Sequence, residues 1–307
     1  MSKRVLLTIA TATLIGCGGA SYPSATLSIA WAQDASDWDA QLHTAARLIA
    51  GSAVKNAGAT VLRAGVEIRL DPGWHTYWRD PGDSGAPPKL DFSGSDNVKS
   101  VTVLWPAPER FPDGAGGNSI GYFDHVILPL RVEPANAAKQ SSLRLKLGYD
   151  VCSNICVPVE SDLKLSLSGN GAEDMAIERA EIRVPRRVAL GQSIPIRAIA
   201  DRAVADRPIA DKGLAILSAH RVPGDGHDRV VVEVAAPAGA QVDLFAEGPT
   251  PDWSLPLPEP TGDRSARKRQ FSFDLEGLPP GAQAQGASLT LTAVSGDDAI
   301  EVPVRLD

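Results

Sequence analysis

The sequence predicts an all-β protein made of two successive β-sandwich domains. Its 307 residues are enough for two domains of ordinary size, each with its own hydrophobic core. Short stretches in which apolar and polar residues alternate recur along the chain, as expected for strands that bury one face. Turns separate these stretches, and the 28 Gly and 24 Pro residues favour many turns, as in sandwiches.

The clearest expected strand is residues 61–70, because apolar residues at the even positions alternate with Arg63, Glu67 and Arg69. Residues 38–50 fit either a helix or a strand, and we expect a strand over their second half. A short helix before Pro185 could occupy residues 172–184. The other expected strands are residues 98–104, 125–133, 143–149, 162–167, 229–235, 242–246, 270–275, 288–294 and 300–306.

The N-terminus has the features of an export signal. Lys3 and Arg4 precede an apolar run over residues 5–16, which is too short to span a bilayer. We expect residues 1–32 to be removed as a signal peptide, by cleavage after Ala32 at an A-x-A site. The alternative is a lipobox that ends in Cys17, which would give a lipoprotein. Both routes predict a periplasmic protein, and no later apolar run is long enough for a transmembrane segment in the mature chain.

A change in composition at residues 169–171, Gly-Asn-Gly, indicates a domain boundary. We therefore expect a first domain over residues 33–170 and a second β domain over residues 171–307. Removal of residues 1–32 takes away Lys3 and Arg4 and no acidic residue, so the net charge goes from −7 to −9. An acidic mature chain argues against nucleic acid as a partner.

Two cysteines, Cys152 and Cys156, carry the strongest chemical signal in the chain. They lie on a connection between two expected strands, and the short spacing allows both Cα atoms to come within disulfide range. Three chemistries fit this pattern. The pair could exchange electrons with other thiols, it could be a structural disulfide in a non-catalytic binding module, or its thiolates could bind Cu(I). The sequence lacks the second cysteine pair or His-rich tract of a zinc site and the nucleophile elbow of a hydrolase.

Four separated motifs then point to a family. They are DPGWHTYWRDPGDSG at residues 71–85, LWPAP at 104–108, SIGY at 119–122 and CSNICVP at 152–158. In this order they resemble the N-terminal domain of the thiol:disulfide interchange protein DsbD, and within it the branch of ScsB-type copper-tolerance proteins. The resemblance covers roughly residues 43–168.

The resemblance implies an immunoglobulin-like fold for the first domain and the activity of a thiol–disulfide oxidoreductase of the protein-disulfide reductase type, without a cofactor. The implied partners are a membrane-embedded thiol–disulfide electron donor and periplasmic disulfide-bearing proteins. His75 and Tyr77 are expected on a strand beside Cys152 and Cys156, and Tyr122 near the same site. His75 is the histidine expected to act as base, and the resemblance favours Cys156 as the attacking cysteine.

Two departures from the family pattern are visible. A glycine-rich segment at residues 112–117 stands where DsbD has a cap loop with an aromatic residue. The membrane and thioredoxin-like portions of DsbD have no counterpart in the sequence, and a second β domain stands in their place. We therefore expect a stand-alone periplasmic member of the family, with a second domain whose role no motif indicates.

Overall fold

The computed structural model describes residues 34–56, 58–195, 213–224 and 226–307. Within these ranges the elements are β-strands except for one short α-helix, so the predicted all-β class is confirmed. The expected signal peptide, its cleavage site and Cys17 lie outside the described residues. No helix in the described ranges is long and apolar enough to cross a membrane.

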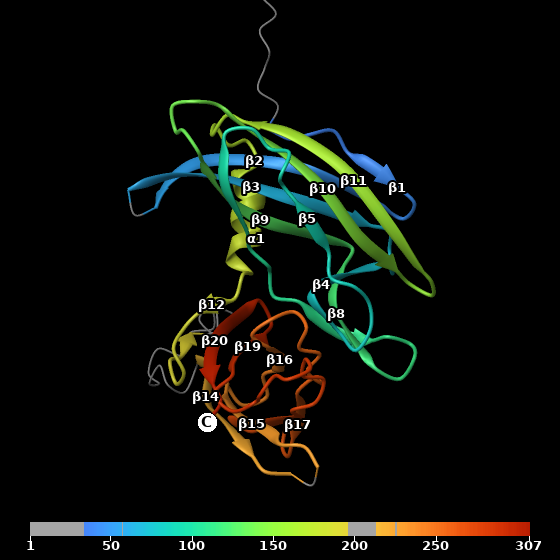
Figure 1. Ribbon diagram of the computed structural model, residues 1–307, viewed down its shortest axis with the longest axis vertical. Coiled ribbons are helices and arrows are strands. Elements are labelled where there is room, and N and C mark those ends of the chain that lie inside the picture. The colour runs from blue at the N-terminus through green and yellow to red at the C-terminus, as the bar shows by residue number, and fades with distance from the viewer. Residues whose placement is uncertain (1–33, 57, 196–212, 225) are drawn as a thin grey trace, which may run out of the picture. The chain divides into compact units, whose positions relative to one another are not determined.

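The first domain is an immunoglobulin-like sandwich of two antiparallel sheets (Figure 1). One sheet has the order β1 (Asp39–Gln41), β2 (Thr44–Asn56), β3 (Ala59–Leu70), β9 (His125–Pro134) and β6 (Val98–Val103). The other has the order β11 (Cys156–Leu167), β10 (Ser141–Cys152), β4 (His75–Gly82), β8 (Asn118–Phe123) and β7 (Glu109–Pro112), with β5 (Lys89–Asp91) paired to β10.

The core of this sandwich follows from the alternation in its strands. Val66 and Ile68 of β3 are buried in one cluster with Leu145 and Leu147 of β10. The charged neighbours of these residues point away from the core, because successive side chains on a strand face opposite sides of the sheet. The ambiguous residues 38–50 form β1 and the first half of β2, as expected for their second half.

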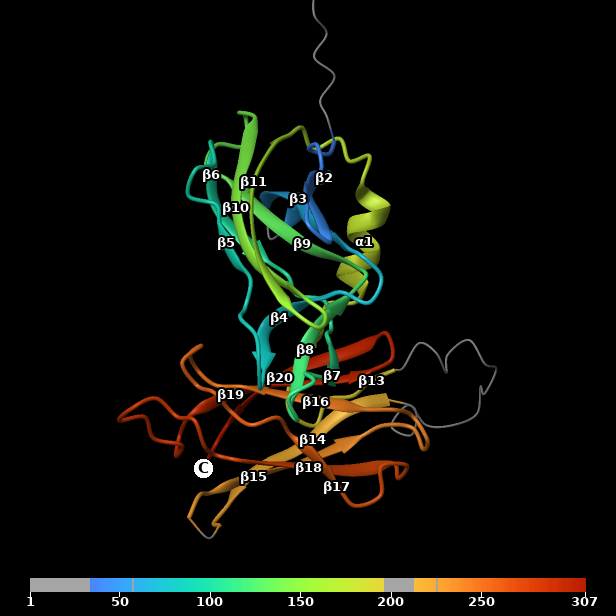
Figure 2. The same cartoon turned by 90° about the vertical axis from the view of Figure 1, so that its right-hand side faces the viewer.

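The helix α1 (Asp174–Ile182) covers the outer face of the β1–β2–β3–β9–β6 sheet (Figure 2). Its buried residues Ile177 and Ala180 pack against Ile49 and Ile127. Arg63 of β3 pairs with carboxylates at both ends of the helix, Asp174 and Glu181. The helix expected between residues 172 and 184 therefore packs with the first sandwich.

The strands that follow the helix form a second sandwich. Its first sheet has the order β12 (Arg186–Arg187), β20 (Asp298–Arg305), β19 (Ser288–Ser295) and β16 (Asp243–Glu247). Its second sheet has the order β13 (Ile194–Pro195), β14 (Gly213–Val222), β15 (Arg229–Ala235), β18 (Lys268–Asp274) and β17 (Glu259–Thr261). Residues from both sheets, such as Val232 and Leu291, share one buried cluster.

Candidate functional site

Cys152 and Cys156 form a disulfide at the end of a β-hairpin. Cys152 is the last residue of β10, Cys156 is the first of β11, and the two are register partners with Cα atoms 4.1 Å apart. The backbone N–H of Ser153 donates to the carbonyl of Ile155, which closes the short connecting loop. The strand ladder therefore places the two sulfur atoms side by side.

The two cysteines differ sharply in exposure. Cys152 is 1% exposed, whereas Cys156 is an exposed residue. Ile155, next to Cys156 in the loop, is 64% exposed. The hairpin end thus presents one cysteine and one apolar side chain to the surroundings and buries the other cysteine.

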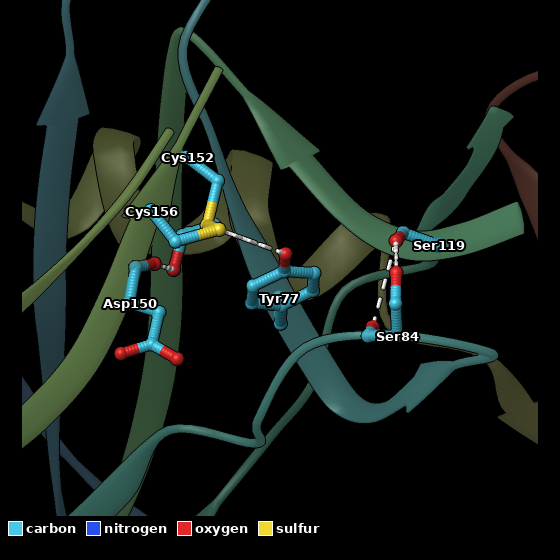
Figure 3. Close-up of a disulfide and its surroundings, with 7 residues drawn as sticks. Tyr77, Ser84, Ser119, Asp150, Cys152 and Cys156 are labelled. Atoms are coloured by element: carbon cyan, nitrogen blue, oxygen red, sulfur yellow. Dashed lines mark hydrogen bonds between the residues drawn. A yellow bond between two sulfur atoms is a disulfide. The ribbon is translucent and has the colours of Figure 1, made fainter. Parts of the chain in front are cut away.

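Tyr77 of β4 lies directly beside the disulfide (Figure 3). Its hydroxyl donates a hydrogen bond to the Cys152 sulfur at 3.3 Å and lies 3.7 Å from the Cys156 sulfur. Burial, and then the negative charge of Asp150, raise the pKa of the Tyr77 phenol above its ordinary value. The hydroxyl therefore stays protonated at neutral pH and faces the sulfur atoms as a hydrogen-bond donor.

His75 is brought to Cys152 by the sheet, because these two residues are register partners of β4 and β10. The His75 ring lies 4.5 Å from the Phe111 ring and 5.5 Å from the rings of Tyr77 and Phe123. Burial among these groups lowers the pKa of His75, so its imidazole is neutral at neutral pH. Among the described residues, no hydrogen bond joins this ring to either sulfur atom.

Tyr122 lies away from the disulfide, in the core of the first sandwich. It is the register partner of Thr76, whereas His75 and Tyr77 pair with Phe123 and Gly121. Its hydroxyl donates to the carbonyl of Pro106 at 2.8 Å. Because neighbours on a strand face opposite sides, the face that carries His75 and Tyr77 is not the face of Tyr122.

The comparisons with known proteins agree with this geometry. Residues 45–168 match the family described as thiol:disulfide interchange protein DsbD, N-terminal. These residues form a DsbD N-terminal domain. The match runs from β2 to the end of β11 and includes both cysteines, His75 and Tyr77. No curated protein sequence matches the chain.

A solved structure extends the likeness beyond the DsbD N-terminal domain. The chain is similar to the crystal structure of the N-terminal periplasmic domain of ScsB from Proteus mirabilis, with a TM-score of 0.65 and 19% sequence identity. The similarity covers 89% of this chain and 98% of that chain. At this identity the likeness concerns the fold, and its coverage shows that the second sandwich is shared as well.

Several residues around the disulfide of this DsbD N-terminal domain were not expected from the sequence. Phe111 and Phe123 form the aromatic surroundings of His75. Gly85 lies flat on Tyr77, since a Cβ at Gly85 would come within 2.3 Å of the phenol ring. The segment is held there by Ser84, whose hydroxyl lies 2.9 Å from that of Ser119 (Figure 3).

The glycine-rich segment at residues 112–117 is anchored by its own acidic residue. The Asp113 carboxylate accepts hydrogen bonds from the backbone N–H groups of Ala115 and Gly117, at 2.8 and 2.9 Å. These hydrogen bonds lower the pKa of Asp113. The aromatic residue that directly precedes this segment, Phe111, is buried against His75.

A metal centre built from many ligands finds no support in the described part of the chain. No group of three or more His, Cys, Asp or Glu side chains is placed to hold a metal ion there. A two-thiolate Cu(I) site at Cys152 and Cys156 would require the disulfide to be reduced first, and it remains a prediction.

Proposed function

We propose that the chain performs thiol–disulfide exchange in the periplasm through Cys152 and Cys156, relaying electrons between a membrane-embedded thiol–disulfide donor and periplasmic disulfide-bearing proteins. The observation that carries this proposal is the asymmetry of the disulfide. One cysteine is exposed at a hairpin end, and the other is buried under the hydroxyl of Tyr77. The DsbD N-terminal family and the expected signal peptide support the same reading.

Electron uptake begins at the exposed cysteine. A thiolate of the donor attacks the Cys156 sulfur, the Cys152–Cys156 bond breaks, and Cys152 leaves as a thiolate with the electron pair of that bond. The Tyr77 hydroxyl, 3.3 Å from the Cys152 sulfur, stabilises the negative charge. The second thiolate of the donor then attacks the donor sulfur that is bound to Cys156. This step releases Cys156 as a thiolate and leaves the donor oxidised to a disulfide.

Electron delivery reverses these roles. The Cys156 thiolate attacks a disulfide sulfur of the acceptor protein and forms a mixed disulfide, and one acceptor sulfur leaves as a thiolate. The Cys152 thiolate then attacks the Cys156 sulfur, which restores the Cys152–Cys156 bond and releases the second acceptor thiol. Two electrons and two protons pass to the acceptor in each cycle.

Tyr77 and His75 take different parts in this proposal. Tyr77, with its raised pKa, is a donor and not a base. His75, with its lowered pKa, is a neutral imidazole that can accept a proton from a thiol when the pair is reduced. Tyr122, bonded to the Pro106 carbonyl, has a packing role in the core.

A purely structural role for the disulfide is disfavoured by its position. The two cysteines already face each other in a continuous ladder from Ser141↔Leu167 to Cys152↔Cys156. A cross-link that closes a loop of about five residues contributes only about 2 kcal/mol by loop entropy. The bond therefore adds little that the β10–β11 hairpin does not already provide.

Single-cysteine variants test the proposed order of events. With Cys152→Ser, the exposed Cys156 should react with oxidised glutathione or a small aromatic disulfide and accumulate as a mixed disulfide. With Cys156→Ser, the buried Cys152 should react more than about tenfold more slowly with the same disulfides. Stopped-flow absorbance and mass spectrometry follow both reactions. Equal rates for the two variants, or faster reaction of Cys152, would contradict the proposal.

A further inference from the structure

The second sandwich forms ion pairs with β4, the strand that carries Tyr77. The Arg79 guanidinium, on β4, bonds both carboxylate oxygens of Glu247 at 2.7 Å and one oxygen of Glu301 at 2.8 Å. Glu247 ends β16 and Glu301 lies in β20, so one sheet of the second sandwich supplies both partners. All three side chains are mostly buried.

The same part of β4 lacks ordinary strand pairing. Its ladder with β8 stops after Tyr77↔Gly121 and resumes only at Gly82↔Ser119. Its pairing with β10 consists of His75↔Cys152. Among the strands that the structure describes, none therefore pairs with residues 78–81. Their position depends on side-chain contacts.

Those contacts lead to the second sandwich. Trp78 is fully buried, and its ring lies 5.7 Å from that of Phe245 in β16. The Arg79 guanidinium lies over the Trp78 ring at 4.5 Å, which joins the two contacts into one unit. This unit begins one residue after Tyr77.

A second set of ion pairs joins the second sandwich to β7, beside the aromatic residues that surround His75. Arg110 of β7 pairs with Asp243 at 2.9 Å and with Glu259 at 2.8 Å, both in the second sandwich. The next residue along β7, Phe111, packs on His75. The strands β4 and β7 therefore both form ion pairs with the second sandwich.

We propose that the second sandwich is a positioning domain for the redox site, and that Arg79 is its main positioning residue. Through the Glu247 and Glu301 pairs it fixes the part of β4 that follows Tyr77, and so holds the Tyr77 hydroxyl against the Cys152 sulfur. This inference rests on the proposed function, because it concerns the equilibrium of the same cysteine pair.

The direction of the effect follows from the hydrogen bond. A hydroxyl stabilises a thiolate more than a disulfide sulfur, because a hydrogen bond to a charged acceptor is about twice as strong as one to a neutral acceptor. Loss of the Tyr77 hydrogen bond therefore favours the disulfide. Arg79→Met, which keeps an apolar stem over Trp78 and removes the ion pairs, should shift the equilibrium with glutathione about tenfold towards the disulfide, or about 30 mV to lower potential.

A double-mutant cycle tests whether Arg79 acts through Tyr77. The redox equilibrium with glutathione is measured for the wild-type mature chain, Arg79→Met, Tyr77→Phe and the double variant. We expect Tyr77→Phe to shift the equilibrium at least as far as Arg79→Met, and the double variant to equal Tyr77→Phe. An Arg79→Met variant with the wild-type equilibrium, or one whose shift adds fully to that of Tyr77→Phe, would overturn the inference.

Two further variants separate positioning from electrostatics and from folding. Arg144→Met removes an equally charged side chain from β10, where Arg144 pairs with Asp162 at 2.8 Å, and should leave the equilibrium unchanged. The double variant Glu247→Gln/Glu301→Gln removes the carboxylates that pair with Arg79. It also tests the inference if Arg79→Met does not fold. A direct charge effect would shift its equilibrium opposite to that of Arg79→Met, whereas loss of positioning shifts both the same way.

The redox equilibrium of the wild-type protein with glutathione distinguishes a failure of the exchange function from a failure of the positioning role. A wild-type pair that glutathione cannot reduce would refute the exchange function itself. A wild-type pair that equilibrates with glutathione, together with unshifted Arg79 and Glu247/Glu301 variants, would refute only the positioning role.

Discussion

The β10–β11 hairpin and the β4 strand lie side by side at the disulfide but are held in opposite ways. The hairpin is paired without interruption up to Cys152↔Cys156, whereas β4 loses its ladder after Tyr77 and depends on side-chain contacts with the second sandwich. The sulfur atoms are therefore placed by local backbone pairing, and their chemical surroundings by contacts between residues far apart in the sequence. Substitutions in the hairpin core should accordingly change the stability alone, whereas substitutions in β4 should change both the stability and the reduction potential.

The largest expected effect concerns Trp78. Trp78→Ala removes a fully buried ring from the unpaired part of β4 and should lower the free energy of unfolding by about 3–5 kcal/mol. The reduction potential of the remaining folded protein should also fall, because Tyr77 is no longer held. The matched variant Leu145→Ala, in the regularly paired β10, should cost about 2–5 kcal/mol and leave the potential unchanged. Urea unfolding and glutathione titration measure both quantities, and equal shifts in potential would contradict the comparison.

Gly85 offers a cleaner contrast, because a matched glycine exists. Gly85 and Gly116 both have positive φ angles, 99° and 105°, so alanine strains the backbone at either position. Only at Gly85 would the new methyl group meet the Tyr77 ring, whereas at Gly116 it meets no atom within 4 Å. Gly85→Ala should therefore cost about 1–3 kcal/mol more than Gly116→Ala. It alone should shift the redox equilibrium, and similar behaviour of the two variants would show that Gly85 does not position Tyr77.

The smallest expected effect is a difference in pH dependence between the two regions. Burial raises the pKa of Asp80, in the unpaired part of β4, from 3.8 to about 6. The folded state then binds more protons than the unfolded state between about pH 4 and pH 6, so stability falls as the pH rises through this window. Asp80→Asn, which keeps the oxygen that accepts the Gly82 N–H, should stabilise the protein by about 1–2 kcal/mol at pH 7.5 and hardly at pH 4.

Asp162 on β11 is the control for this pH effect. Its hydrogen bond with Arg144 lowers its pKa, so its contribution to stability is present above the ordinary pKa and is lost as the pH falls. Asp162→Asn should therefore give no gain in stability at pH 7.5. Thermal unfolding at several pH values between 4 and 7.5 measures both variants, and a gain for Asp162→Asn or none for Asp80→Asn would contradict the assignment.

The same contrast explains which features could be predicted from the sequence. Each strand expected from alternation overlaps an observed strand, because a strand with one wet face repeats every two residues. The hairpin position of Cys152 and Cys156 could be predicted for the same reason. The strands β4 and β8 give no such signal: Thr76, Tyr77 and Trp78 are buried in succession, as are residues 119–122. Their presence beside the cysteines was indicated only by the family resemblance.

The surroundings of the disulfide depend on the register between neighbouring strands. This register cannot be predicted from the residues of one strand alone. Phe111 and Phe123 reach His75 because β7, β8 and β4 are neighbours in one sheet. Tyr122 was expected near the thiols, but the register Thr76↔Tyr122 directs it to the core. A one-residue difference in register reverses the face of every side chain on a strand. The proposed role of Arg79 required the contacts with Glu247 and Glu301, more than 160 residues further along the chain.

The reduction potential of the Cys152–Cys156 pair, measured together with the stability of both redox forms, tests the central claim most directly. An exchange site must be reducible by its partners, so the potential should lie between about −270 and −120 mV. The reduced chain should stay folded and lose no more than about 2 kcal/mol of stability, because the closed loop is short. A potential well below about −300 mV, with a reduced form that unfolds, would show that the disulfide is structural and would contradict the proposed function.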